Sequence, residues 1–392
     1  MTKLAEKSIC TGCTACKAIC PHDAISMRAD DEGFLYPHID ASKCTGCGIC
    51  TKACHSLNQG VARKPLAVYA AMAKDDALRL ASSSGGVFSI LAKDILSSGG
   101  VVFGAAFDHD DWHVCHRAAY NEDGLAELRG SKYVQSDVGE SYRHVKDVLK
   151  VGRYVLFSGT PCQIAGIRAF LRKDYEKLLL VDVVCHAAPS PLAWKKYLEK
   201  RVASTYNSRV GELEAIRSIA SRRKYCGWKR YSMSLGFAND MEYRAIFSDD
   251  PFMRGFLAEL YNRPSCHNCP SKNLSSGSDI TIADYWGVDS KLPEMDDDKG
   301  TSLVLVNTDK GAKAFATLAE KITLKESDFN HAMSVNPAIV RPIIPHRNRG
   351  RFFRRVIKSD FDLLVDRMLQ PSLQCRAWAF VGNLLRKMGL KK

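Results

Sequence analysis

Eight cysteines near the start of the chain have the spacing of residues that bind iron–sulfur clusters. They form two runs with the pattern C-x2-C-x2-C-x3-C: Cys10, Cys13, Cys16 and Cys20, then Cys44, Cys47, Cys50 and Cys54. In the known two-cluster arrangement with this pattern, the fourth cysteine of each run binds the cluster of the other run. The pattern predicts two [4Fe–4S] clusters, one on Cys10, Cys13, Cys16 and Cys54 and the other on Cys44, Cys47, Cys50 and Cys20. Bound zinc or a disulfide scaffold is the alternative.

Four later cysteines stand in expected turns: Cys162, Cys185, Cys266 and Cys269. The first follows the turn Gly159-Thr160-Pro161 between an expected strand and helix, the second ends the next expected strand, and the last two form a C-x2-C pair. Four thiolates from separate loops suit a third [4Fe–4S] cluster. Structural zinc, a redox-active or nucleophilic Cys162, or simple packing of the first two cysteines remain open at this point. Cys115, Cys226 and Cys375 are interpreted as packing residues.

A serine–glycine turn precedes the first helix expected after the cysteine runs. It contains Ser84, Gly85 and Gly86, and residues 84–96 have a helical pattern. Backbone N–H groups at a helix N-terminus attract phosphate, so the turn is a candidate phosphate site. A serine that only caps the helix is the simpler alternative.

Helices and strands alternate from residue 66 and must position these groups. Expected strands lie at 66–74, 101–107, 153–159 and 177–185, and expected helices at 84–96, 139–150, 161–172 and 191–202. Buried strands separated by amphipathic helices predict a mostly parallel sheet. Segments 231–239, 241–247 and 279–287 are expected to form a second, smaller, more antiparallel sheet, followed by a strand at 302–308 and a helix at 310–321. The fold class is α/β, with an α+β bacterial-ferredoxin-like module in front.

The 392 residues suffice for two or three domains. We expect a two-cluster domain at 1–60, an α/β body in two parts at 66–208 and 209–345, and a basic helical tail at 346–392. No apolar run reaches the roughly 18 residues of a membrane span. The opening residues lack a signal-peptide pattern, and so many free cysteines are typical of a reducing compartment. We therefore expect a cytoplasmic protein.

Basic residues are concentrated at the end of the chain. Residues 340–392 contain thirteen Lys or Arg against three Asp, a surplus of ten in a formal net charge of +13. Trp378, Val381, Leu384, Leu385 and Met388 have helical spacing there. Such a helix could contact an anionic membrane surface or an acidic partner, but more often a helix of this kind packs its apolar face on its own domain. Nucleic acid is not expected, because no binding motif accompanies the charge.

Several segments resemble the coenzyme F420 hydrogenase/dehydrogenase beta-subunit family over roughly residues 66–350. They are SSSGGVFSILA, GSKYVQS, VLFSGTPCQIAGIRAFL, LLLVDVVCHAAPSPLAWKKYL, YCGWKRYS, RPSCHNCPSKN and SDITIADYWG. The resemblance implies FAD in the α/β body and a nearby cubane cluster, which favours a third cluster on the four later cysteines. It assigns two loops to the flavin surroundings: Ser84, Gly85 and Gly86, and Ser131, Lys132, Tyr133 and Gln135. Lys132 would face a phosphate or the reduced flavin, and Gly159, Thr160 and Pro161 would shape the pocket.

This chain departs from the usual family pattern at two places. Ala187 follows Cys185-His186 where relatives usually have glycine, and Ala283 opens the segment ADYWG where glycine is common. Such changes matter only if the backbone there needs a positive φ angle or touches a ligand.

The expected function is that of an iron–sulfur flavoprotein oxidoreductase. Single electrons would pass between the clusters and FAD, which exchanges hydride with a small organic substrate. Expected partners are a redox donor or acceptor protein or a deazaflavin-like cofactor. An electron-delivery subunit that docks on a partner enzyme, without substrate chemistry of its own, is the main alternative. An iron–sulfur protein without flavin is a third.

Overall fold

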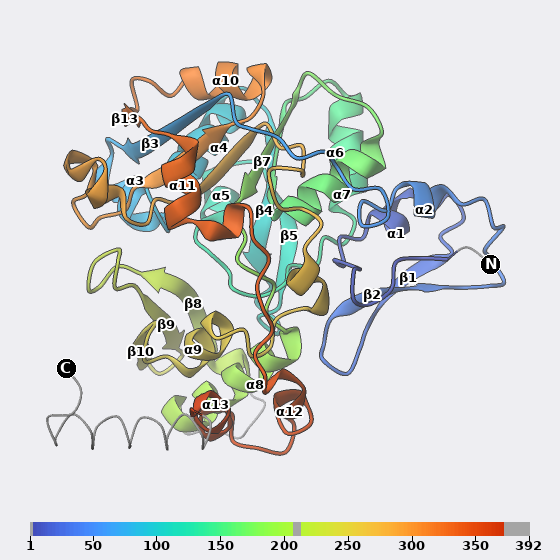
Figure 1. The fold of residues 1–392 in the computed structure, drawn as a ribbon, viewed down its shortest axis with the longest axis vertical. Coiled ribbons are helices and arrows are strands. Elements are labelled where there is room, and N and C mark those ends of the chain that lie inside the picture. The colour runs from blue at the N-terminus through green and yellow to red at the C-terminus, as the bar shows by residue number, and fades with distance from the viewer. Residues whose placement is uncertain (1–2, 207–212, 372–392) are drawn as a thin grey trace, which may run out of the picture.

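An eight-stranded mixed sheet forms the centre of the structure, a computed structural model that describes residues 3–206 and 213–371 (Figure 1). In spatial order the strands are β13 (Ile322–Glu326), β3 (Ala67–Ala73), β12 (Ser302–Val306), β11 (Ile280–Asp284), β7 (Leu178–Val183), β6 (Val155–Gly159), β4 (Val101–Phe107) and β5 (Val114–Ala119). The four strands from β11 to β4 pair in parallel, and the outer pairs are antiparallel. The predicted α/β class is confirmed.

Alternating apolar residues bury both faces of this sheet. On one face α4 (Val87–Ser97), α5 (Glu122–Leu128) and α10 (Asp309–Ala316) pack against residues such as Val102 and Leu156. On the other face α6 (Ser141–Lys150) and α7 (Pro161–Leu171) pack against their neighbours Phe103 and Phe157. Successive side chains of a strand point to opposite faces, so strands covered on both sides are apolar throughout. The short α3 (Asp76–Ala81) follows β3, and α11 (Phe329–Val335) follows β13.

A second sheet contains β8 (Ile216–Arg223), β9 (Ser232–Phe237) and β10 (Glu242–Ile246), all antiparallel. The predicted smaller sheet is thus present, but its predicted membership is wrong for residues 279–287. That segment is β11 and pairs with β7 and β12 in the main sheet. A short apolar run identifies a buried strand without identifying its neighbours. The main sheet therefore draws strands from both predicted parts of the body.

Aromatic helices connect the second sheet to the C-terminal segment. The helices α8 (Pro191–Arg201), α9 (Pro251–Leu257), α12 (Arg349–Phe353) and α13 (Phe361–Leu369) pack together through side chains that include Trp194, Tyr197 and Phe252. A π-helical turn, Val202–Tyr206, extends α8. The predicted amphipathic helix with Trp378 and Met388 lies outside the described residues. Within the described residues, no helix is long and apolar enough to cross a membrane.

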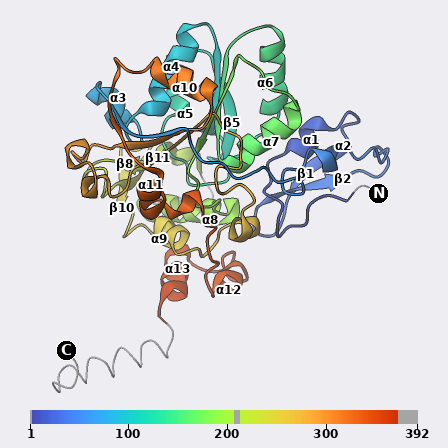
Figure 2. The same ribbon diagram turned by 45° about the horizontal axis from the view of Figure 1, so that its top comes forward.

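The N-terminal module is small and packs against the body. It consists of α1 (Ala15–Ile19), a hairpin of β1 (Ile25–Ala29) and β2 (Leu35–Ile39), and α2 (Ile49–Lys52). Its own apolar cluster is limited to Cys10, Phe34 and Tyr36, with Ala5 and Phe353 beside it. In both views the module lies beside α6 and α7 (Figure 2), and Ala15 and Ala18 of α1 belong to the core under those helices. Docking therefore supplies much of the apolar burial that the module lacks.

Candidate metal centres and their surroundings

The two N-terminal cysteine runs fold into the same local backbone shape. Gly12 and Thr14 have φ angles of 62–69°, and Gly46 and Gly48, at the equivalent positions of the second run, have φ angles of 72°. Left-handed residues between ordinary ones turn successive N–H groups toward one side and create a concavity that suits an anion. Each run therefore presents its first three sulfurs around a backbone that favours negative charge.

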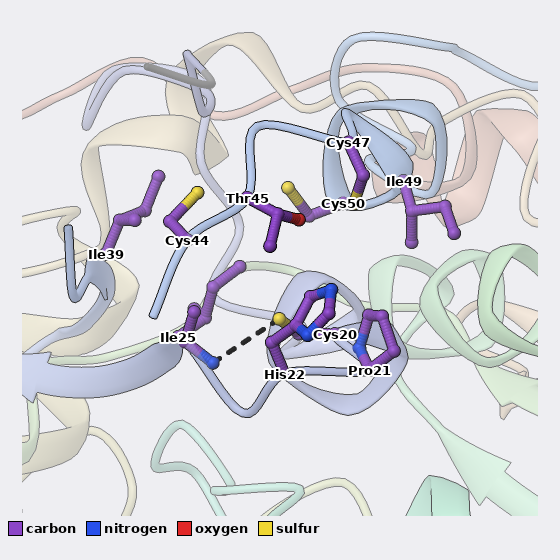
Figure 3. Close-up of a pocket in the computed structure, with 11 residues that line it drawn as sticks. Cys20, Pro21, His22, Ile25, Ile39, Cys44, Thr45, Cys47, Ile49 and Cys50 are labelled. Carbon is purple, nitrogen blue, oxygen red and sulfur yellow. Dashed lines mark hydrogen bonds between the residues drawn. The ribbon is translucent and has the colours of Figure 1, made fainter. Parts of the chain in front are cut away.

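The structure gathers the eight sulfurs into two crossed groups of four. One cavity is lined by Cys10, Cys13, Cys16 and Cys54, which we call the inner set. The other is lined by Cys20, Cys44, Cys47 and Cys50, which we call the outer set. Figure 3 shows Cys20 on the opposite side of its cavity from the three sulfurs of the second run, and the backbone N–H of Ala24 donates to its Sγ at 3.4 Å. The grouping is the one that the sequence pattern predicts.

The four later cysteines also meet, and we call them the third set. Cys162 lies in the first turn of α7, Cys185 follows β7, Cys266 lies within the short helix Pro264–Asn268, and Cys269 directly follows that helix. Burial raises the pKa of Cys162 to about 11, and the neighbouring Cys269 adds to that rise. Burial also raises the pKa of Cys266 to about 12, with Cys269 and Cys162 contributing. Four adjacent thiols of this kind ionise readily only when a cation compensates them, which suits a metal cluster.

The inner and third sets lie against the same helix. Gly166, one turn after Cys162 in α7, faces Cys13: a Cβ added at Gly166 would lie 3.1 Å from Cys13 Cβ and 3.2 Å from its Sγ. Burial raises the pKa of Cys13, and the charges of Cys16 and Cys162 raise it further. The absent side chain of Gly166 therefore lets the two sets approach each other.

The turn of residues 159–161 lies where the sequence places it. Gly159 ends β6, and Thr160 and Gln163 form a capping box at the start of α7, with Pro161 in the first helical position. The Oγ1 of Thr160 lies 3.2 Å from Cys162 Sγ. This turn holds Cys162 at the carboxyl end of a central parallel strand, where open α/β sheets bind ligands.

The two loops that the resemblance assigns to the flavin surroundings contact each other through Ser131, at the start of the second loop. The N–H and hydroxyl of Ser131 both donate to Ser83 Oγ, at 2.7 and 3.0 Å. The N-cap of α4 is Gly86, with a φ angle of 90° and no side-chain cap, so the serine N-cap alternative is wrong. Ser84 Oγ instead donates to the carbonyl of Thr301. Gly85 is needed for packing, because a Cβ there would lie 2.3 Å from the carbonyl oxygen of Ala71.

The rest of the second loop runs away from that turn. Lys132 Nζ donates to the carbonyls of Glu127 and Arg129 at the end of α5, and burial lowers the pKa of Lys132 to about 7. The hydroxyl of Tyr133 accepts from Arg222 at 3.1 Å. Gln135 Nε2 donates to the carbonyl of Thr11 in the N-terminal module. The loop thus extends from the serine–glycine turn to the inner set.

A buried group of one arginine and two tryptophans lies next to Tyr133 and was not predicted from the sequence. Arg222 of β8 forms an ion pair with Asp284 at 2.9 Å and lies over the ring of Trp286. Trp228 stacks on Trp286 with ring centroids 4.9 Å apart and donates from Nε1 to Asp284. The segments YCGWKRYS and ADYWG supply Trp228, Asp284 and Trp286 but not Arg222, so the resemblance contained only part of the signal. Neither Ala187 nor Ala283 has a positive φ angle, so neither position requires glycine for its backbone.

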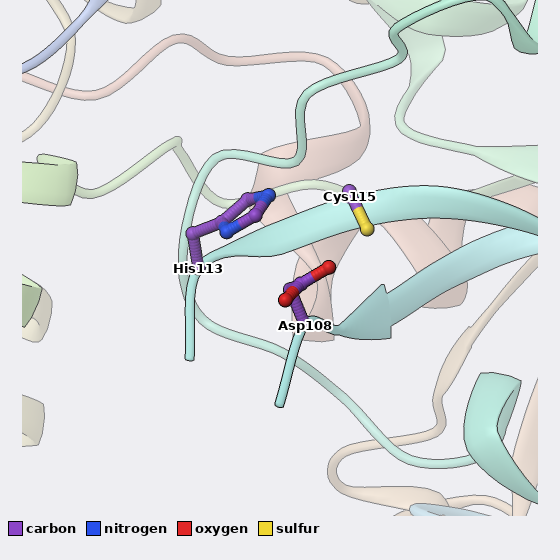
Figure 4. A group of neighbouring side chains, drawn as sticks. All are labelled: Asp108, His113 and Cys115. Carbon is purple, nitrogen blue, oxygen red and sulfur yellow. The ribbon is translucent and has the colours of Figure 1, made fainter. Parts of the chain in front are cut away.

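Asp108, His113 and Cys115 form another group with metal-ligand atoms, near the β4–β5 turn (Figure 4). The guanidinium of Arg117 pairs with Asp108, and its charge opposes the rise in the pKa of Cys115 that burial causes. His113 is exposed and pairs with Asp111. Because the positive charge of Arg117 acts on both Asp108 and Cys115, it disfavours a bound cation, and we assign no metal site here.

Two parts of one protein family match this body in order along the chain. Residues 68–142 match the N-terminal part of the beta subunit of coenzyme F420 hydrogenase/dehydrogenase, and residues 152–331 match the C terminus of that same beta subunit. The chain belongs to this family. Residues 9–57 of this beta-subunit family member match the 4Fe-4S dicluster domain. It is therefore an iron–sulfur electron-transfer protein of the coenzyme F420 hydrogenase/dehydrogenase type.

Two relatives and one solved structure are similar to this chain. The F subunit of the F(420)H(2) dehydrogenase of Methanosarcina mazei is 24% identical over 338 residues, which cover 83% of this chain and 87% of the relative. The B subunit of the Na(+)-translocating ferredoxin:NAD(+) oxidoreductase complex of Acetobacterium woodii is 47% identical over 45 residues, 12% of each chain. A solved structure of the F420-reducing [NiFe] hydrogenase complex from Methanosarcina barkeri has a TM-score of 0.48 and 16% identity, over 71% of this chain and 90% of that one.

Proposed function

We propose that this chain is an iron–sulfur flavoprotein oxidoreductase that holds three [4Fe–4S] clusters and FAD. The observation that carries the proposal is the gathering of twelve cysteines into an outer, an inner and a third set of four, with Cys13 of the inner set close to α7, which carries Cys162. When bound, the clusters supply one-electron steps and FAD links these to two-electron chemistry.

The protein's residues arrange the three sets in a series. The outer set includes the exposed Cys47 and is the one open to a redox partner. The inner set is covered by α7 and by the loop that carries Gln135. The third set lies at the carboxyl end of β6 and β7. A partner protein at the outer set and a substrate near the body would then use opposite ends of the series.

The flavin belongs, in this proposal, beside the loops of Ser83 and Ser131 and the group of Arg222, Trp228 and Trp286. Serine hydroxyls, a helix N-terminus at Gly86 and buried cations suit the phosphates and ring of a dinucleotide. A small organic substrate or a deazaflavin-like cofactor would be the hydride partner, because relatives are named for coenzyme F420. The predicted cytoplasmic location is part of the same proposal.

Anaerobic purification followed by metal, sulfide and flavin analysis tests this function. Three clusters predict about twelve iron and about twelve sulfide per chain, with four of each in a cluster. Replacing Cys266 and Cys269 together by serine should remove about one third of the iron. Cys226→Ser is the matched control, because this exposed cysteine lies in none of the three sets. Eight iron in both the wild type and the double variant would contradict the third cluster, and colourless material without flavin would contradict the FAD proposal.

A delivery role remains the second candidate, because the names of the relatives describe subunits of larger complexes. In that case the isolated chain would reduce its flavin with a reduced ferredoxin but would not turn over any small acceptor. Turnover of a deazaflavin or another small acceptor by the purified chain alone would favour the enzyme.

A further inference from the structure

Arg263 is a buried cation without an acidic partner. Its side chain is 1% exposed, and it lies directly before the short helix that carries Cys266. Its Nε donates to the carbonyl of Cys10 at 2.8 Å, Nη2 to the carbonyl of Leu35 at 2.9 Å, and Nη1 to Gln135 Oε1 at 2.7 Å. All three acceptors are neutral. Among the described residues no carboxylate lies within 4.0 Å of it, whereas the buried Arg222 pairs with Asp284.

Burial of an uncompensated guanidinium is costly, so something must stabilise it. The ring of Tyr36 lies 4.2 Å from its Cζ and supplies part of the stabilisation. Cysteine sulfur also lies close to the guanidinium. Nη2 lies 4.0 Å from Cys10 Sγ of the inner set. Toward the third set, the backbone N–H of Cys266 donates to the carbonyl of Arg263 at 3.0 Å.

Arg263 therefore contacts the inner set through its guanidinium and the third set through its backbone. At the outer set, Arg143 Nη2 donates to the carbonyl of Cys20 at 3.4 Å, but the Arg143 side chain is 35% exposed and paired with Asp23. A hydrogen-bonded path also runs from the inner set to the third, from the carbonyl of Thr11 through Gln135 to Arg263.

We propose that Arg263 is a shared counter-charge for the inner and third sets, and that it raises the reduction potentials of both clusters together. This inference rests on the proposed function, since it assumes clusters on those cysteines. Reduction adds one electron to a cluster that already carries negative charge, and a fixed positive charge stabilises the reduced form. Because one guanidinium serves two sets, its removal should shift both potentials in the same direction. Arg263 is thus a positioning and tuning residue rather than a ligand.

Redox titration of the anaerobic full-length protein, followed by electron paramagnetic resonance, tests this role. Arg263→Gln removes the charge but keeps a planar hydrogen-bonding group, and Arg263→Lys keeps the charge. We expect Arg263→Gln to lower the equilibrium constant for one-electron reduction at two clusters by at least about tenfold, which is 59 mV. The cluster on the outer set should keep its potential and serves as an internal reference. In Arg263→Lys, both potentials should stay close to their wild-type values.

A matched variant separates charge from docking. Arg143→Gln removes another arginine that holds the module to the body, but its charge is already compensated by Asp23. It should leave the potentials of the inner and third clusters unchanged. Equal potentials in wild type and Arg263→Gln, or a shift of all three clusters alike, would overturn the inference.

Two further outcomes are also decisive. Loss of iron from Arg263→Gln but not from Arg263→Lys would support the charge role, because lysine cannot reproduce the three hydrogen bonds. Loss of iron from both variants would overturn it and leave a structural tether. Wild-type protein without any cluster signal would instead refute the proposed function itself, so the two failures are distinguishable.

Discussion

Replacing Gly166 by alanine should separate the N-terminal module from the body. The new Cβ would lie 2.7 Å from the hydroxyl of Tyr142 and little more than 3 Å from Cys13. Ordinary contacts need about 3.5–4.0 Å, so α7 and the loop of Cys13 must move apart by roughly 0.5–1 Å. Overpacking of this kind costs about 1–3 kcal/mol, and the better helix propensity of alanine returns up to about 1 kcal/mol. We expect a net loss of up to about 2 kcal/mol.

Thermal unfolding and iron content measure the effect. A loss of 1 kcal/mol lowers the midpoint by about 2–4 °C in a domain of this size, and displacement of Cys13 should reduce iron retained in the inner set. Gly350→Ala in α12 is the matched control, because its Cβ meets only the end of the Arg354 side chain at 3.4 Å. That variant should be as stable as wild type or slightly more stable.

A double variant checks the assigned contact. Tyr142→Phe removes the nearest obstacle, at the loss of its hydrogen bond to the carbonyl of Gln163, worth about 1 kcal/mol. Gly166→Ala combined with Tyr142→Phe should therefore be less destabilised than the sum of the single variants. Unchanged midpoint and iron content in Gly166→Ala would refute the reasoning.

Three further changes test the packing around the sites. Burial lowers the pKa of His116 from 6.5 to about 4. Between these pH values the unfolded chain binds more protons than the folded one, so the free energy of unfolding falls by up to about 3 kcal/mol as the pH drops from 6.5 to 4. His116→Gln should weaken this loss, as measured by thermal midpoints between pH 6.5 and pH 4. Arg143→Gln removes the hydrogen bond to the carbonyl of Ala18 and should cost about 1 kcal/mol, seen as faster proteolysis within residues 1–60. Glu32→Gln leaves the mostly buried Arg349 without its ion-pair partner and should lower the free energy of unfolding by about 1–3 kcal/mol. The variant should therefore be cleaved faster by protease, and a rate equal to that of the wild type would contradict the prediction.

The sequence predicts those parts of the molecule that depend on local pattern. The spacing of the N-terminal cysteines predicts the crossed grouping, because two runs with this spacing exchange their fourth cysteines in the known two-cluster arrangement. Alternating apolar runs predict the central strands and the helices between them. By contrast, β11 was assigned to the wrong sheet, because the choice of neighbouring strand depends on long-range pairing.

Arg263 and Gly166 could not be recognised from the sequence. An arginine at the start of a proline-rich loop is typical of a solvent-exposed residue, and its burial requires the module to dock on the body. A glycine within a helix is simply a weak helix former in a single sequence. Its role depends on Cys13, which lies far from it along the chain. The sequence therefore predicts the cysteines that form the sets, but it does not predict residues that act at contacts between distant segments.

The slight apolar core of the N-terminal module has a consequence for biogenesis. These residues leave the ribosome before α6, α7 and Arg263, on which they rest. A segment of this size is seldom stable without metal or a supporting surface. We expect a newly made chain to keep its leading cysteines accessible to iron–sulfur delivery until the body has folded, so that closure of the two parts follows cofactor insertion.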